Sequence, residues 1–167
     1  MADRDKLAEV QGPLKERYRA EPDAARLTLR RTGRLGEGVT CSVETGRAMV
    51  EAGLHPLTGG DGLTACSGDM LLEALVACAG VTLGAVATSL GVDVGDATLV
   101  AEGDLDFRGT LSVAKDAPVG FSAIRLRVEI DGDVDEQQRA LLAKLTERFC
   151  VVFQTLSNPP KLSVSFD

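Results

Sequence analysis

Residues 67–90, SGDMLLEALVACAGVTLGAVATSL, predict one long helix that decides the fold. Ser67 stands where an N-cap belongs, and Gly91 ends the run as a C′ glycine does. A helix that is apolar all round is buried rather than lying on a surface, so we predict a central core helix with Cys78 at its middle. From position 70 onward its polar residues are few: Glu73, Thr82, Thr88 and Ser89.

The same stretch is long enough to cross a bilayer, which takes about 20 apolar residues. Three features argue against a membrane span: Glu73 inside the run, more Ala and Gly than Leu, Ile and Phe, and no flanking Lys/Arg clusters. We therefore predict a soluble protein that has no membrane partner.

Charge and length exclude several classes of protein. The chain has 167 residues, enough for one domain that buries roughly 70% of its unfolded surface. A net charge of −7 argues against nucleic-acid binding, which needs a basic face, and it repels anionic membranes. The first 20 residues lack the apolar region of a signal peptide, so we expect a cytoplasmic protein whose four cysteines are thiols.

Neither a metal nor a cofactor is expected. The sequence has one histidine, His55, which we place in a solvent-facing loop, and it has no C-x-x-C pair. The glycines of GRLGEG, residues 33–38, do not have the spacing of a dinucleotide-binding or phosphate-binding loop.

Alternation of apolar and polar residues predicts strands on both sides of the central helix. A second long helix is predicted from Asp135 to Leu156, with Cys150 on the flank of its apolar stripe. Hairpin-like strands with segregated helices indicate an α+β fold with antiparallel sheet. An amphipathic stripe of Leu7, Val10, Leu14 and Tyr18 predicts an N-terminal helical extension over residues 1–22. The predicted strands lie near residues 27–29, 39–43, 47–52, 97–101, 104–113, 122–130 and 162–166.

The cysteines are the candidates for chemistry. Cys41, on the inner face of a strand, fits simple core packing, because free Cys is among the most buried residue types. Cys66 precedes the helix start, where free N–H groups could lower its pKa, but a structural role is favoured. Cys78 and Cys150 are the cysteines of the two long helices, and composition alone would leave both inert.

Two segments, SGDMLLEALVACAGVTL and LTERFCVVFQTL, resemble the OsmC/Ohr family (osmotically inducible protein C-like, organic hydroperoxide resistance). LHPLTGGDG and the closing KLSVSF fit as well, so the similarity runs from about Leu27 to Phe166. The resemblance implies an OsmC-like domain over 23–167, with antiparallel sheets, a buried central helix and a second long helix. It also implies an intertwined homodimer in which the two cysteines face each other near the subunit interface.

The implied activity is a thiol peroxidase that reduces organic hydroperoxides and is recycled by a dithiol reductant. By resemblance Cys78 is the peroxidatic thiol and Cys150 the resolving one, and apolar neighbours such as Leu75, Phe149 and Phe153 suit a hydrophobic peroxide. A free thiol is only about 3% ionised at pH 7, so a nearby arginine would raise that fraction and stabilise the leaving oxygen. The first hairpin offers Arg34, with Arg31 and Arg47 as rivals; Arg34 could also be a plain turn residue.

The chain departs from the family pattern at two positions. Peroxidase members have a Glu ten residues before the first cysteine, where this chain has Gly68, with Asp69 the nearest carboxylate. Many members have Cys-Pro where this chain has Cys150-Val151. An OsmC-like protein without peroxidase activity, with another thiol or sulfur-handling role or an apolar ligand at the dimer interface, therefore stays as an alternative.

Overall fold

The computed structural model describes residues 4–5, 9, 12, 20, 33–35, 40–44, 49–112 and 114–166, with the backbone alone at 33–35 and 40–44. In the predicted N-terminal extension, Arg4, Asp5, Glu9, Gly12 and Ala20 are helical. Its stripe of Leu7, Val10, Leu14 and Tyr18 lies outside the described residues, as does the strand predicted near 27–29. The chain divides into two compact units, one of residues 1–22, 74–100 and 127–167, the other of residues 23–73 and 101–126.

The unit of residues 23–73 and 101–126 contains a four-stranded sheet in the order β1-β2-β3-β4. β1 (Gly33–Leu35), β2 (Thr40–Glu44) and β3 (Met49–Gly53) pair antiparallel, and β4 (Ala65–Cys66) pairs parallel with β3. Antiparallel hairpins are confirmed for the described part of this region. A short 3-10 helix, η2 (Pro56–Thr58), lies between β3 and β4.

His55 is half-buried, so its placement as a solvent-facing residue was wrong. Its Nδ1 accepts a hydrogen bond from the Leu57 amide at 3.1 Å, which caps η2. Its ring stacks on Phe107, with the ring centroids 4.9 Å apart.

The strand predicted for residues 104–113 was also wrong. β5 (Ala97–Asp104) ends at the start of that range, and the Asp106 side chain caps a short helix, α3 (Phe107–Thr110). An aspartate that satisfies the first free amides of a helix competes with strand pairing, and the alternation of residues did not show it.

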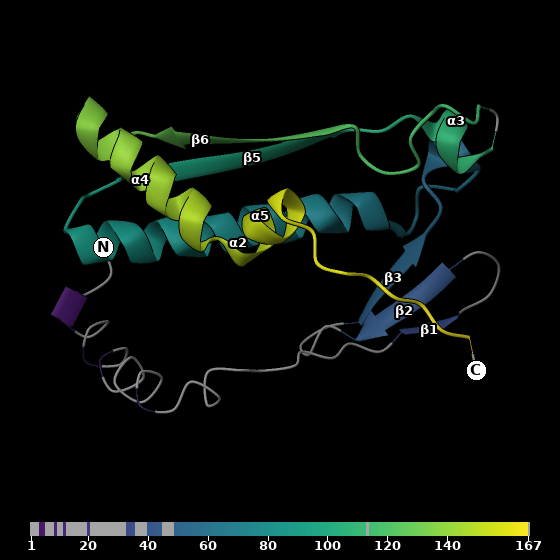
Figure 1. Ribbon diagram of the computed structural model, residues 1–167, viewed down its shortest axis with the longest axis horizontal. Coiled ribbons are helices and arrows are strands. Elements are labelled where there is room, and N and C mark those ends of the chain that lie inside the picture. The colour runs from purple at the N-terminus through teal and green to yellow at the C-terminus, as the bar shows by residue number, and fades with distance from the viewer. Residues whose placement is uncertain are drawn as a thin grey trace. The chain divides into compact units, whose positions relative to one another are not determined.

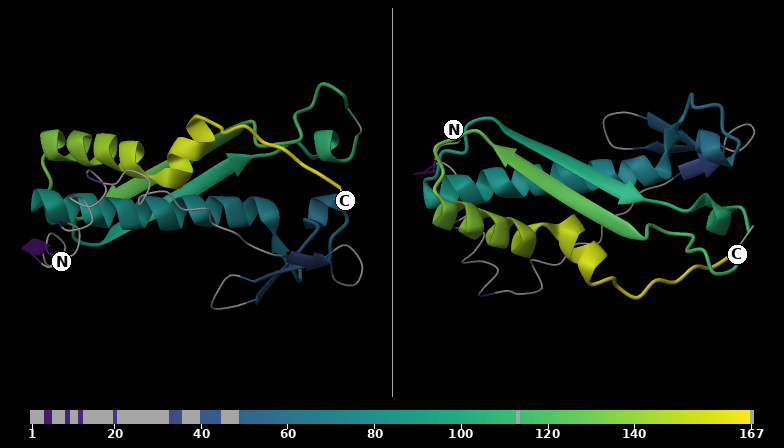
Figure 2. Two further views of the ribbon diagram at one scale, coloured as in Figure 1. Left: turned by 60° about the horizontal axis from the view of Figure 1, so that its bottom comes forward. Right: turned by 90° about the horizontal axis from the view of Figure 1, so that it is seen from above.

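The unit of residues 1–22, 74–100 and 127–167 is built on α2 (Ser67–Leu90), from Ala74 onward. α4 (Glu136–Phe149) and α5 (Val151–Ser157) lie along α2 and run in the opposite direction (Figures 1 and 2). β5 and β6 (Ala123–Ile130) run opposite to each other and show the predicted alternation of half-buried and exposed side chains. The core joins these helices and strands through Leu83, Val86, Ala87, Val92, Val134 and Leu142, with Ala97, Val128 and Ile130 packed against them.

Burial of α2 on all sides was wrong for the single chain. Buried residues such as Leu75, Ala79 and Leu83 follow one side of the helix. The exposed face consists of Ala74, Ala77, Val81 and Gly84, and Val81 is 76% exposed. The helix is apolar as predicted. Among the described residues, however, α4, α5 and the strands cover only one side of α2. By length and composition α2 could also span a membrane, which for a single helix is weak evidence.

The second long helix is two helices rather than one. It begins as predicted at Asp135, which forms a capping box with Gln138. It breaks at Cys150, whose backbone is extended (φ −72°, ψ 108°), and α5 restarts at Val151. Two β-branched valines follow the break, and such residues have low helix propensity.

The predicted closing strand is absent from residues 158–166 of the described chain. Leu162, Val164 and Phe166 are 88%, 82% and 95% exposed. A strand is stabilised by hydrogen bonds to a neighbouring strand, and none of the described strands pairs with this segment. The strand predicted from this alternation was therefore wrong for the described chain.

Candidate functional site

The structure brings Cys78 of α2 and Cys150 of the α4–α5 junction together within the same unit. The two thiols lie close enough for each to shift the pKa of the other, with Cys150 lowering that of Cys78 and Cys78 raising that of Cys150. Cys150 is only 1% exposed, whereas Cys78 is half-buried and so more accessible from solvent. Both cysteines are free thiols.

The break at Cys150 turns backbone amides toward the two sulfurs. The Phe153 amide donates to Cys150 Sγ at 3.5 Å. The amides of Val151 and Val152 face the Cys78 sulfur and lower its pKa. The Thr82 hydroxyl, one helical turn beyond Cys78, donates to the Cys78 carbonyl at 2.8 Å. An uninterrupted helix would have used the amides of residues 151–153 in its own ladder of hydrogen bonds.

The two thiols have pKa values shifted in opposite directions. Burial is the largest influence on Cys78 and raises its pKa, but the donors from Val152, Cys150, Val151 and Thr82 outweigh it, so the pKa lies below its ordinary value. Burial also raises the pKa of Cys150, and the neighbouring Cys78 raises it further. The arrangement therefore favours a thiolate on Cys78 and a neutral, donating thiol on Cys150.

A thiolate beside a neutral thiol can do nucleophilic and redox chemistry. The thiolate attacks an electrophilic atom, and the second thiol then displaces the product to give a disulfide. The described residues contain no group of three or more His, Cys, Asp and Glu side chains placed to hold a metal.

Comparison with protein families gives a match to the model described as OsmC-like protein over residues 59–165, more than half of the chain. This chain belongs to the OsmC-like family. The matched range contains both cysteines of the pair. A comparison with curated proteins finds no match.

Solved structures of OsmC/Ohr proteins share the fold. An OsmC-like protein from Mycoplasma pneumoniae is 16% identical with a TM-score of 0.67, covering 80% of this chain and 89% of that one. The organic hydroperoxide resistance protein OsmC from Legionella pneumophila is 16% identical with a TM-score of 0.62, covering 80% and 92%. OhrB of Bacillus subtilis, an organic hydroperoxide resistance protein, is 18% identical with a TM-score of 0.57, covering 80% and 93%. These similarities place the mixed α+β chain among OsmC/Ohr structures.

The position of the predicted arginine side chains relative to the thiols lies outside the described residues. Arg34 lies in β1, with its backbone opposite Ser42, so it is a strand residue rather than a turn residue. Its side chain is not described, and Arg31 and Arg47 lie outside the described residues. Cys41 lies in β2, where only its backbone is described.

Gly68, which replaces the glutamate of the family pattern, is surrounded by apolar and sulfur atoms. A Cβ at this position would lie 3.4 Å from Phe121, 3.6 Å from Cys66 Sγ and 3.6 Å from Leu105. Phe121 also lies against Gly103, where any side chain would overlap its ring. The surroundings of Gly68 thus form an apolar wall, which we did not predict.

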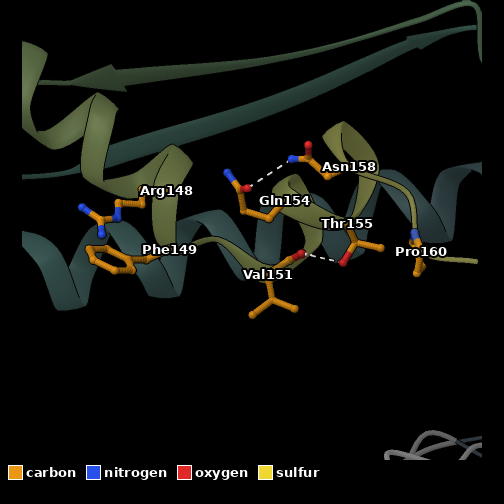
Figure 3. Close-up of a pocket in the computed structure, with 7 residues that line it drawn as sticks. All are labelled: Arg148, Phe149, Val151, Gln154, Thr155, Asn158 and Pro160. Carbon is orange, nitrogen blue, oxygen red and sulfur yellow. Dashed lines mark hydrogen bonds between the residues drawn. The ribbon is translucent and has the colours of Figure 1, made fainter.

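An open hollow of about 500 Å³ lies on the outer side of the α4–α5 junction (Figure 3). The Arg148 guanidinium lies over the Phe149 ring, 5.3 Å from its centroid. Phe149 is therefore a surface residue rather than part of the buried stripe, while Leu75 is a core residue. The hollow is lined by Arg148, Phe149, Val151, Gln154, Thr155, Asn158 and Pro160, without either cysteine.

The opposed pKa shifts predict different alkylation of the two thiols. Only the thiolate reacts, so Cys78 is expected to react with iodoacetamide at a lower pH than a free thiol, and Cys150 only at a higher pH. Cys150→Ala removes a donor and is expected to move the Cys78 profile to higher pH, whereas Cys150→Ser keeps a hydroxyl donor. Mass spectrometry of each cysteine between pH 5 and 10 measures both profiles; coincident profiles would contradict the assignment.

The Val151 amide gives a second prediction. Val151→Pro is expected to slow alkylation of Cys78 at pH 7 by about tenfold, because a donor to the thiolate is lost. The first position of a helix accepts proline, and Cys150 already has the extended backbone that a following proline requires. Val151→Ala keeps the amide and should react like the parent chain. Equal rates in the proline and alanine variants would exclude the amide as a donor.

Proposed function

We propose that this OsmC-like protein is a cysteine-based thiol peroxidase that reduces organic hydroperoxides in defence against oxidative stress. The observation that supports it is the closeness of the buried Cys150 thiol to Cys78, together with the amides that lower the pKa of Cys78. Two of the similar structures are of proteins named organic hydroperoxide resistance proteins, which agrees with this proposal.

In the proposed reaction the Cys78 thiolate attacks the terminal oxygen of the hydroperoxide. A sulfur–oxygen bond forms, the oxygen–oxygen bond breaks, and the alkoxide takes a proton from solvent to leave as an alcohol. Cys150 then attacks the sulfenic sulfur, so that a disulfide forms and the oxygen leaves as water. A dithiol reductant would return both cysteines to thiols.

Arg34 remains the proposed arginine for the thiolate, with Arg31 and Arg47 as alternatives. A cation beside the reacting sulfur would stabilise both the thiolate and the charge that develops on the leaving alkoxide. Since β1 gives only the backbone of Arg34, the support is its position in the first hairpin.

We further propose that the protein acts as an intertwined homodimer in the cytoplasm. Two features support a second copy: the exposed apolar face of α2, and the exposed alternating segment of Leu162, Val164 and Phe166, with which none of the described strands pairs. Apolar surfaces of this kind mark interaction sites. An unpaired segment with strand alternation is suited to pairing with the sheet of another chain.

A second candidate function is favoured by the apolar wall around Gly68. Gly68 itself has no carboxylate, and its neighbours Phe121, Leu105 and Cys66 supply none, so the carboxylate of the family pattern is missing at this position. An OsmC-like protein without peroxidase activity, with another sulfur-handling role or an apolar ligand at the dimer interface, fits this difference.

The test is a single turnover of the reduced protein with one equivalent of cumene hydroperoxide. The peroxidase proposal expects loss of two thiols per chain, one equivalent of alcohol, and a Cys78–Cys150 disulfide in the peptide mass spectrum. If both thiols remain reduced after the peroxide has been present for an hour, the proposal is wrong. The second candidate is then examined by whether an apolar ligand slows alkylation of Cys78.

A further inference from the structure

Thr146 carries the one buried side-chain oxygen or nitrogen atom that lacks a hydrogen-bond partner among the described residues. The residue is 6% exposed and lies on α4 one turn before Cys150, whose amide donates to the Thr146 carbonyl at 2.9 Å. A buried hydroxyl left without a partner destabilises a fold, so its presence calls for an explanation.

Because α2 and α4 run antiparallel, helix geometry puts Thr146 at the same level along the helices as Thr82. Cys78 contacts Cys150, and Leu142 belongs to the same core cluster as Leu83 and Val86. Figure 2 shows α4 running alongside α2 in the opposite direction, so the residue one turn after Cys78 is level with the residue one turn before Cys150. These two positions are Thr82 and Thr146.

Thr82 has hydrogen-bonding capacity to share with a ligand. Its Oγ1 donates to the Cys78 carbonyl at 2.8 Å and lies within hydrogen-bond contact of the Cys78 sulfur. A hydroxyl has one proton and two lone pairs, so Thr82 can still accept a hydrogen bond. The proton of Thr146 is uncommitted. Together they offer one acceptor and one donor, each one helical turn from a thiol, on helices whose buried residues include Leu75, Ala79 and Leu142.

We propose that the hydroxyls of Thr82 and Thr146 form a polar subsite that binds the –OOH group of the hydroperoxide beside Cys78. A hydroperoxide both donates and accepts hydrogen bonds, which this pair matches. Thr82 accepts from the terminal O–H, and Thr146 donates to the oxygen that leaves as alkoxide when sulfur attacks the terminal oxygen. This subsite rests on the proposed peroxidase function.

The experiment compares Thr146→Val, Thr146→Ser, Thr82→Val and the control Thr88→Val. Thr88 is a buried threonine of α2 whose Oγ1 donates to the Gly84 carbonyl at 2.7 Å, so it repeats the bond of Thr82 away from the thiols. Three quantities are measured for each reduced protein. They are the rate of reaction with cumene hydroperoxide, the rate of Cys78 alkylation, and the protection of Cys78 from alkylation by the non-oxidising alcohol 2-phenyl-2-propanol.

Thr146→Val is expected to slow the peroxide reaction by about tenfold or more and to lose protection by the alcohol, with Cys78 alkylation unchanged. It should also raise the melting temperature, because an unpartnered hydroxyl is removed. Thr82→Val should lower both the peroxide and the alkylation rates, since Thr82 contacts the sulfur. Thr146→Ser and Thr88→Val should behave like the parent chain.

The outcomes separate the subsite from the peroxidase function. If Thr146→Val matches Thr88→Val in peroxide rate and alcohol protection, the subsite is wrong and the peroxidase proposal stands. If the parent chain does not consume peroxide but the alcohol protects Cys78 in a Thr146-dependent manner, the subsite stands and the peroxidase proposal fails. If neither reaction nor protection occurs in the parent chain, both are overturned.

Discussion

Cys78→Ser is expected to abolish consumption of organic hydroperoxide. Serine keeps the size of the side chain and its hydrogen bonds, so the helix α2 and the contact with Cys150 should be retained. A serine hydroxyl does not ionise near neutral pH and forms no sulfenic acid. The rate of peroxide loss should therefore fall to that of the buffer alone, as measured by a single-turnover assay of residual peroxide.

Cys150→Ser is expected to leave the first attack intact and to stop the reaction there. Without a resolving thiol, Cys78 remains as sulfenic acid and is over-oxidised by excess peroxide. Mass spectrometry should show additions of one, two and then three oxygens on the Cys78 peptide. The matched control is Cys66→Ser, which removes another free thiol and should still form the Cys78–Cys150 disulfide.

The two variants together test the division of roles. If Cys78→Ser consumes peroxide at the parent rate, Cys78 is not the peroxidatic thiol, and Cys66 becomes the residue to examine. If Cys150→Ser cycles normally with a dithiol, resolution does not pass through Cys150. Since Cys150 is 1% exposed, direct attack on it by a bulky peroxide is disfavoured, which is why the more accessible Cys78 is assigned the first step.

Local patterns predicted the elements whose stability is local. Each of three elements follows from a pattern inside its own segment of sequence. They are the capped start at Asp135, the alternating strand β6 and the long helix α2. The break at Cys150 was missed because an apolar stripe continues through it. The break leaves the Val151 and Val152 amides without helix partners, and their effect on the pKa of Cys78 depends on a sulfur that lies on another helix. A pattern within one segment of sequence cannot show such a contact.

Long-range contacts explain the remaining differences. Burial of α2 was predicted from its composition, but composition does not say which chain covers each face. Likewise, Leu162, Val164 and Phe166 alternate as in a strand and are exposed in the single chain. The partners of Gly68 come from residues 105 and 121, so its apolar wall could not be predicted from the helix sequence.

The exposed face of α2 leads to the second large expected effect: Val81→Asp should convert the proposed homodimer into monomers. Val81 is 76% exposed and is flanked along the helix by Ala77 and Gly84, which would allow close approach of another backbone. Placing a carboxylate in such an apolar interface without a partner costs several kcal/mol. The dissociation constant should therefore rise by about a hundredfold or more.

Light scattering and sedimentation at micromolar protein concentration measure this effect. The control is Val119→Asp, the same chemical change at a residue that is 66% exposed in the loop before β6. The control should remain dimeric, and circular dichroism should show both variants folded. A parent chain that is monomeric at these concentrations would contradict the homodimer, whereas a dimeric Val81→Asp would mean that the second copy binds elsewhere. Since Cys78 and Cys150 meet within one chain, monomeric Val81→Asp should still form their disulfide when oxidised, which separates assembly from thiol pairing.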